Sequence, residues 1–155
     1  MIRSIYIDTS VFGGYFDEEF NKDTVKFFDK VINDKIKIII SEVVNNELLG
    51  SPDNVKRFFN SIPKDMIKEV SLTEEVKALA RKYVTAKIVS EKCIPDCLHI
   101  ATATINNADV VVSWNFKHFV NLERKRGYNA VNLIEGYKQI EIVSPKEVFI
   151  YDITR

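Results

Sequence analysis

Hydrophobic and polar residues follow two alternating patterns along the chain. Short runs rich in β-branched and aromatic residues predict strands at 4–8, 36–41, 67–72, 109–113 and 140–145. The segments between them repeat apolar residues at helical spacing, for example Phe28, Val31 and Ile32. Strands that alternate with helices predict a parallel sheet covered on both faces. The predicted fold class is therefore α/β, with three layers and about five parallel strands.

The helix signals are equally regular. Helices are expected at 21–35, 42–51, 51–62, 73–90 and 94–108, followed by helical pieces over 115–137. Ser51 is expected to cap one helix, with Pro52 at its first position, and Thr73 to open another. Gly127 is expected to break the last helical segment. A chain of 155 residues suits one core, so residues 1–155 are expected to form a single domain.

Charge and composition narrow the classes of function. Lys and Arg number 22 and so do Asp and Glu, so any nucleic-acid binding requires a local basic patch. The two cysteines suit a reducing cytosol. No apolar run approaches the ~20 residues that cross a bilayer, and the first residues lack the apolar core of a signal peptide. A cytoplasmic location without a membrane partner is expected.

Asp8 directly follows the first predicted strand. In a parallel sheet the carboxyl ends of the strands share one edge, and ligands bind in the crevice there. A carboxylate at the end of an apolar strand must be solvated, paired or bound to a metal. The alternative is a structural role, in which Asp8, Thr9 or Ser10 caps the next helix.

Two further acids are expected near the same edge. Glu47 lies in the helix after the second strand, on the side of Val43 and Val44, where it needs a partner; otherwise it is an exposed helix glutamate. Asp96 lies in the first turn of a buried helix, where an acid also complements the helix dipole. His99 shares its face and is expected either to pair with it or to be an ordinary core histidine.

Acids gathered in one crevice repel one another unless a cation neutralises them. Carboxylate oxygens suit Mg²⁺ or Mn²⁺, which position and ionise water and stabilise charge on a phosphate. Zinc is not expected, because Cys93, Cys97 and His99 fit no common zinc spacing. The sequence also lacks the glycine-rich loops that bind nucleotide phosphates.

Five segments together resemble the PIN-domain nucleases, in particular the VapC-type toxins of toxin–antitoxin pairs. They are "YIDTSVF", "SEVVNNELL", "IPDCLHIATA", "ADVVVSWNFKHF" and "IEIVSPKEV", which span nearly the whole chain in the family's order. The resemblance implies a three-layer PIN-like fold and an Mg²⁺- or Mn²⁺-dependent endoribonuclease whose products carry a 5′-phosphate and a 3′-hydroxyl. It implies that Asp8, Glu47 and Asp96 hold the metal, with Ser10 beside it. A cognate antitoxin and a possible homodimer are also implied.

Asn115 departs from the family pattern, in which an aspartate commonly follows the fourth strand. Its amide keeps one neutral oxygen but supplies no charge, so a second metal is expected to bind more weakly. Asp109 lies at the other end of that strand and is expected to cap the turn that enters it. The alternative function is a degenerate PIN domain that binds RNA or a protein partner without cleavage.

A basic segment follows the proposed site. Contacts with RNA phosphates are expected from Lys117, His118, Arg124, Lys125 and Arg126. Trp114, Phe116 or Tyr128 could stack on unpaired bases. The alternatives are a solvated helix face for the cations and core packing for the aromatic rings.

Overall fold

The computed structural model describes residues 1–115 and 121–150. Its strands are β1 (Ser4–Ile7), β2 (Lys37–Ser41), β3 (Ile67–Val70), β4 (Val110–Val112) and β5 (Glu141–Val143). Its helices are α1 (Thr9–Gly14), α2 (Asn21–Asn33), α3 (Glu42–Leu49), α4 (Asp53–Ser61), α5 (Glu74–Thr85), α6 (Ile94–Ile105) and α7 (Leu122–Ile134), with short 3-10 helices at Lys64–Met66 and Glu91–Cys93.

The strands form one parallel sheet in the order β3-β2-β1-β4-β5. The chain builds the sheet outward from β1 to β3 and then returns to add β4 on the other side of β1. The carboxyl ends of β1 and β4 therefore flank the point where the direction of winding changes, which is where such sheets bind ligands. Asp8 follows β1 at this point, and Ser113 follows β4.

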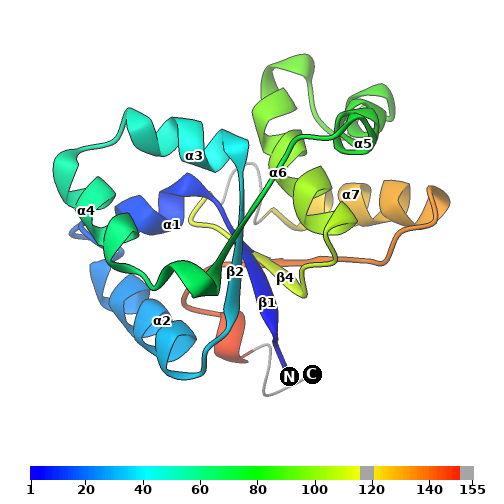
Figure 1. Cartoon of the computed structure of the whole chain (residues 1–155). Helices are drawn as coiled ribbons and strands as arrows, with labels where there is room; N and C mark the ends of the chain where they lie inside the picture. The colour runs from blue at the N-terminus through cyan, green and yellow to red at the C-terminus, as the bar shows by residue number, and fades with distance from the viewer. Residues whose placement is uncertain (116–120, 151–155) are drawn as a thin grey trace.

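Helices cover both faces of the sheet. Figure 1 shows α1, α2, α3 and α4 on one side and α5, α6 and α7 on the other. The central strands are buried along most of their length: Ile5, Ile38 and Val111 are all inaccessible to solvent. Strands buried on both faces are apolar throughout rather than alternating, which explains the continuous apolar runs in the sequence. The predicted three-layer parallel arrangement is confirmed.

One helix was not predicted, and two local predictions are wrong. Helix α1, a short helix that ends in Gly13 and Gly14, was not expected. Ser51 does not cap α4, whose N-cap position is Pro52; its hydroxyl instead donates to the carbonyl oxygen of Glu47.

Thr73 does cap α5, as expected, by accepting a hydrogen bond from the backbone N–H of Val76. No helix of the described ranges is long and apolar enough to cross a bilayer.

The second wrong prediction concerns Gly127, which lies inside a continuous α7. A Cβ atom at this position would lie 2.6 Å from Cγ2 of Ile88, which follows α5. Glycine is therefore required by the close approach of α7 to that segment, and the packing gain outweighs its poor helix propensity.

We expect Gly127→Ala to lower the free energy of unfolding by about 1–3 kcal/mol, because the added methyl group overpacks against Ile88. Gly13→Ala is the matched control: no atom lies within 4 Å of a Cβ there, so this change should be neutral or stabilise by up to ~1 kcal/mol. Urea denaturation measures both. If Gly127→Ala stabilises the protein as Gly13→Ala does, the proposed tight packing is wrong.

Candidate active site

Asp8 forms the centre of a polar site at the carboxyl end of β1. The residue is 5% exposed, and its two carboxylate oxygens accept hydrogen bonds from different serines. The hydroxyl of Ser10 donates to Oδ1 at 2.6 Å, and that of Ser113 donates to Oδ2 at 2.6 Å. Asp8 occupies the N-cap position of α1, yet its side chain makes no capping hydrogen bond. The capping alternative is therefore wrong.

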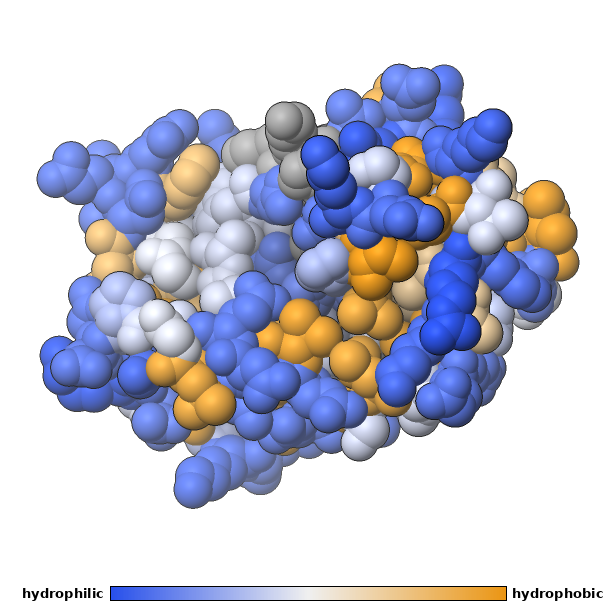
Figure 2. Space-filling model, turned by 90° about the horizontal axis from the view of Figure 1, so that it is seen from above, coloured by the Kyte–Doolittle hydropathy of each residue, from blue (hydrophilic) through white to orange (hydrophobic). Residues whose placement is uncertain are grey.

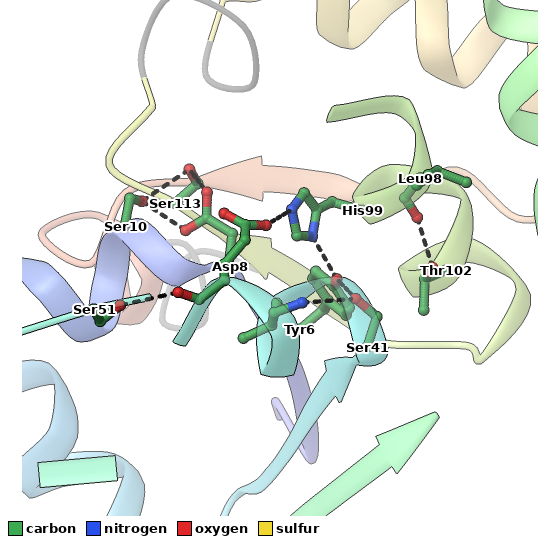
Figure 3. A network of polar contacts seen from close by, with 11 residues as sticks. Tyr6, Asp8, Ser10, Ser41, Ser51, Leu98, His99, Thr102 and Ser113 are labelled. Atoms are coloured by element: carbon green, nitrogen blue, oxygen red, sulfur yellow. Dashed lines mark hydrogen bonds and ion pairs between the residues drawn. The ribbon is translucent and has the colours of Figure 1, made fainter. Parts of the chain in front are cut away.

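Both serines are themselves held by the backbone that follows β4. The hydroxyl of Ser10 accepts from the N–H of Trp114 at 3.0 Å, and that of Ser113 accepts from the N–H of Asn115 at 2.9 Å. Figure 3 shows Ser10 and Ser113 gathered around the Asp8 carboxylate. Ser113 was not expected as a site residue; its place between the apolar strand and Asn115 was the available signal.

Burial raises the pKa of Asp8 above its usual range, because the ionised form loses its hydration. The charge of His99 and the hydroxyls of Ser10 and Ser113 oppose this rise, whereas the charge of Glu47 adds to it. The ionised carboxylate is thus only partly compensated by the surrounding side chains. Such a group favours a cation beside it.

Glu47 of α3 has the partner that its apolar flanks suggested. Its Oε1 lies 3.3 Å from Nε2 of His99 on α6, and its side chain is 46% exposed. The hydrogen bond with His99 lowers the pKa of Glu47, helped by the charge of His99 and the hydroxyl of Thr9 and opposed by partial burial. His99 is 4% exposed, and its Nδ1 lies 2.6 Å from the hydroxyl oxygen of Tyr6. It therefore connects α6 to both β1 and α3.

Asp96 and Asn115, the other two predicted site residues, are both partly exposed. Asp96 is partly exposed in the first turn of α6, three residues before His99. Asn115 is partly exposed two residues after Ser113. Among the residues that the structure describes, no three His, Cys, Asp or Glu side chains lie close enough to form a group that could hold a metal. The structure therefore relates Asp8 and Glu47 through His99 but does not draw the predicted acids into one tight cluster.

The chemistry of the donors nevertheless fits a hydrated, hard cation. Asp8 accepts one hydroxyl on each oxygen, which leaves further lone pairs on both. The hydroxyl oxygen of Thr9 is buried beside Glu47, whose pKa it helps to lower, but it forms no hydrogen bond of ordinary geometry within the described ranges. Mg²⁺ commonly uses one or two carboxylates and keeps several waters, which can satisfy such an orphaned group. Asp8 and Glu47 would be its carboxylate ligands.

The aromatic candidates for base stacking belong to the core instead. The Trp114 ring is 8% exposed, stacks on Phe20 at 4.3 Å and donates from Nε1 to the Thr24 hydroxyl. Tyr128 is inaccessible to solvent. Both rings are therefore unavailable to RNA bases in this structure. Phe116, Lys117 and His118 lie outside the described residues.

The described cations of the basic segment point in different directions. Arg124 contacts Sγ of Cys93 at 3.9 Å and helps to line a cavity of about 420 Å³. Lys125 forms an ion pair of 3.9 Å with Glu141, the first residue of β5, and with Arg126 lines a separate groove. Because Glu141 marks the amino end of its strand, that groove lies away from the carboxyl edge.

Figure 2 looks onto the carboxyl edge, where hydrophilic surface adjoins an apolar patch.

Asp109 has the structural role that its position suggested. Its Oδ2 accepts hydrogen bonds from the backbone N–H groups of Arg3 at 2.7 Å and Ser4 at 3.1 Å. This carboxylate therefore joins the amino ends of β1 and β4. It cannot replace an acid at Asn115, which lies at the opposite edge of the sheet.

A model of the PIN domain family matches residues 5–122. Comparison with curated protein sequences gives no match. Similar solved structures include FitAcB from Neisseria gonorrhoeae, with a TM-score of 0.60 and 17% identity over 91% of this chain and 97% of that one. VapBC2 from Rickettsia felis, bound to a DNA fragment from its promoter, has a TM-score of 0.57 and 14% identity over 91% and 98%. A toxin–antitoxin complex from Klebsiella pneumoniae has a TM-score of 0.56 and 13% identity over 77% and 93%. At these identities the likeness shows the fold.

The opposite pKa shifts of the two acids predict opposite effects of neutral replacements. The folded-state pKa of Asp8 is raised, so its ionisation destabilises the metal-free protein increasingly as the pH rises from about 4 through that pKa. Asp8→Asn should therefore stabilise the protein at pH 7 in chelator, and the gain should vanish in acid. The pKa of Glu47 is lowered, so Glu47→Gln should lose stability at pH 7 and lose less as the pH falls through the folded pKa. Thermal unfolding across pH checks both; Asp8→Asn destabilising at pH 7 would contradict the assignment.

Proposed function

Because the chain belongs to the PIN-domain family, we propose that it is an endoribonuclease that depends on Mg²⁺ or Mn²⁺. The matched region contains all four candidate catalytic residues: Asp8, Glu47, Asp96 and Asn115. The observation that carries the proposal is the buried Asp8 carboxylate, held by two hydroxyls at the carboxyl end of the central strand. We also propose that residues 1–155 form a single PIN-like domain.

We assign the metal to Asp8, Glu47 and Asp96. Asp8 is fixed by Ser10 and Ser113, so its remaining lone pairs are oriented before a ligand arrives. Asp96 extends the donor set from the first turn of α6. Asn115 contributes a neutral amide oxygen, to the metal or to a bound water. With three carboxylates, the site suits one firmly bound ion, completed by water and by the substrate phosphate.

When bound, the ion lowers the pKa of a water molecule and stabilises charge on the scissile phosphate. The residues of this chain supply the other requirements. Glu47 is half-exposed and ionised, so it can orient the attacking water or accept its proton. Arg124 is a candidate for binding an RNA phosphate, and the other predicted cations remain weaker candidates: Lys117, His118, Lys125 and Arg126. The expected products carry a 5′-phosphate and a 3′-hydroxyl.

A toxin role with a cognate antitoxin is part of the proposal. It is supported by structures of the same fold that were determined as toxin–antitoxin or related complexes. The antitoxin would inhibit cleavage by binding the toxin, and a homodimer is a further expected assembly. The proposed location is the cytoplasm, where the RNA substrate occurs.

Cleavage of RNA by the purified protein tests the proposed function. We expect activity with Mn²⁺ or Mg²⁺ that chelator abolishes, and we expect Asp8→Asn and Asp96→Asn each to lower the rate by at least about a hundredfold, since each removes a ligand charge. Asp29→Asn on the exposed face of α2 is the matched control and should keep the wild-type rate. Equal cleavage by wild type and both site variants would show that the activity comes from elsewhere.

Replacing Asn115 by aspartate tests its place in the site. We expect Asn115→Asp to tighten Mn²⁺ binding about tenfold, because a fourth carboxylate adds a charged oxygen ligand. Asn33→Asp adds the same charge at the end of α2, beside the amino edge of the sheet, and should leave the affinity unchanged. Calorimetry measures both.

Equal Mn²⁺ affinity in wild type and Asn115→Asp would remove Asn115 from the metal site. The alternative function, a degenerate PIN domain that binds RNA or protein without cutting, is favoured by the neutral Asn115 and by the dispersed acids of the described residues. It predicts no Mn²⁺ binding by the wild type, even with RNA present.

A further inference from the structure

His99 is buried in α6, yet its ring reaches two other elements of the fold. Nδ1 lies 2.6 Å from the hydroxyl oxygen of Tyr6 on β1, and Nε2 lies 3.3 Å from Oε1 of Glu47 on α3. A hydrogen-bond partner at each nitrogen fixes both the rotation of the ring and the atom that it presents to Glu47.

The Tyr6 hydroxyl determines how the ring is bound. Tyr6 is inaccessible to solvent, and its O–H donates to the Ser41 hydroxyl oxygen at 2.9 Å. A phenol has one hydrogen to donate, so the oxygen of Tyr6 is left to accept from the Nδ1–H of His99. The opposite nitrogen, Nε2, is then directed at Glu47, and because that carboxylate can only accept, the contact is a hydrogen bond when Nε2 also carries a proton. Figure 3 shows Tyr6 and Ser41 on one side of the His99 ring.

Ser41 closes the connection to α3. It is the N-cap of this helix, and its hydroxyl oxygen accepts a hydrogen bond from the backbone N–H of Val44 at 3.4 Å. The start of α3 is therefore fixed by the same hydroxyl that holds Tyr6. Glu47 lies further along this helix, where His99 contacts its carboxylate directly.

Each element in this network also carries one proposed metal ligand. Tyr6 stands two residues before Asp8, Ser41 caps the helix of Glu47, and His99 stands three residues after Asp96. The network therefore joins the three elements whose spacing determines the spacing of the carboxylates. Hydrogen bonds that orient metal-binding side chains commonly change metal affinity by about 10–100-fold.

We propose that His99 is a positioning residue that holds the Glu47 carboxylate for metal binding, with its ring oriented by Tyr6 and Ser41. The inference rests on the proposed metal-dependent function, because it assigns a second function to a histidine that would otherwise only pack in the core. Its edge-on contact with the Tyr6 ring, at 5.7 Å between centroids, shows that it also packs there.

Two substitutions separate positioning from packing. His99→Phe fills the space but cannot hydrogen bond to Glu47, whereas His99→Gln keeps a side-chain N–H of similar reach. In calorimetry without RNA, we expect His99→Phe to weaken Mn²⁺ binding about tenfold and His99→Gln to recover most of that loss. Melting temperatures measured in chelator show whether a variant loses Mn²⁺ affinity only because its fold is less stable. Equal Mn²⁺ affinities for wild type and His99→Phe, or for the Phe and Gln variants, would overturn the proposal.

A metal-free measurement keeps this test separate from that of the proposed function. The chain has two histidines, so the ring nitrogens of His99 can be assigned in ¹⁵N NMR spectra by comparison with His118→Gln. In chelator, Glu47→Gln should shift the Nε2 resonance of His99 more than its Nδ1 resonance; unchanged resonances would contradict the contact. If the wild type binds no Mn²⁺ even with RNA, the proposed function fails, and the metal-positioning role of His99 fails with it. If it binds Mn²⁺ and only the His99 results differ from expectation, this inference alone fails.

Discussion

The organisation of the site depends on one carboxylate that is buried where the central strand ends. Asp8 is 5% exposed, and burial disfavours its ionised form. Two serine hydroxyls stabilise the charge, and each hydroxyl is oriented by a backbone N–H from the segment after β4. The charge of Asp8 can be stabilised in this way only because β4 lies beside β1. The order of the strands in the sheet places β4 there.

The burial of Asp8 has opposite effects on the stability of the metal-free fold and on the binding of a cation. A buried carboxylate that is only partly compensated destabilises the metal-free fold, while the same feature favours a bound cation. Glu47 differs because it is half-exposed and already contacts His99. In the proposed function the two acids would therefore have different roles: Asp8 as a fixed ligand, and Glu47 as a group that can adjust to metal, water and substrate. His99 connects them through the core, so packing and site geometry are not independent.

The sequence predicts the sheet and its crevice well, because strands covered on both faces must be apolar and their polar ends stand out. Asp8 could be found in that way, and Glu47 could be found because it lies beside apolar residues in the following helix. Ser113 could be noted as the polar end of its strand, but its hydrogen bond to Asp8 could not be predicted, since it depends on β4 lying next to β1. The partner of His99 depends likewise on the approach of α3 to α6. Gly127 was misread for the same reason: its role is a contact with Ile88, and no local propensity records such a contact.

The most direct test of this account is the position of a bound divalent ion. A crystal grown or soaked with Mn²⁺ and measured near the manganese absorption edge would locate the ion by its anomalous scattering. The account predicts a peak within coordination distance of a carboxylate oxygen of Asp8, with Glu47 on the same ion directly or through water. The central claim would be contradicted by a well-occupied Mn²⁺ site elsewhere in a crystal in which Asp8 has no anomalous density beside it and still accepts hydrogen bonds from Ser10 and Ser113.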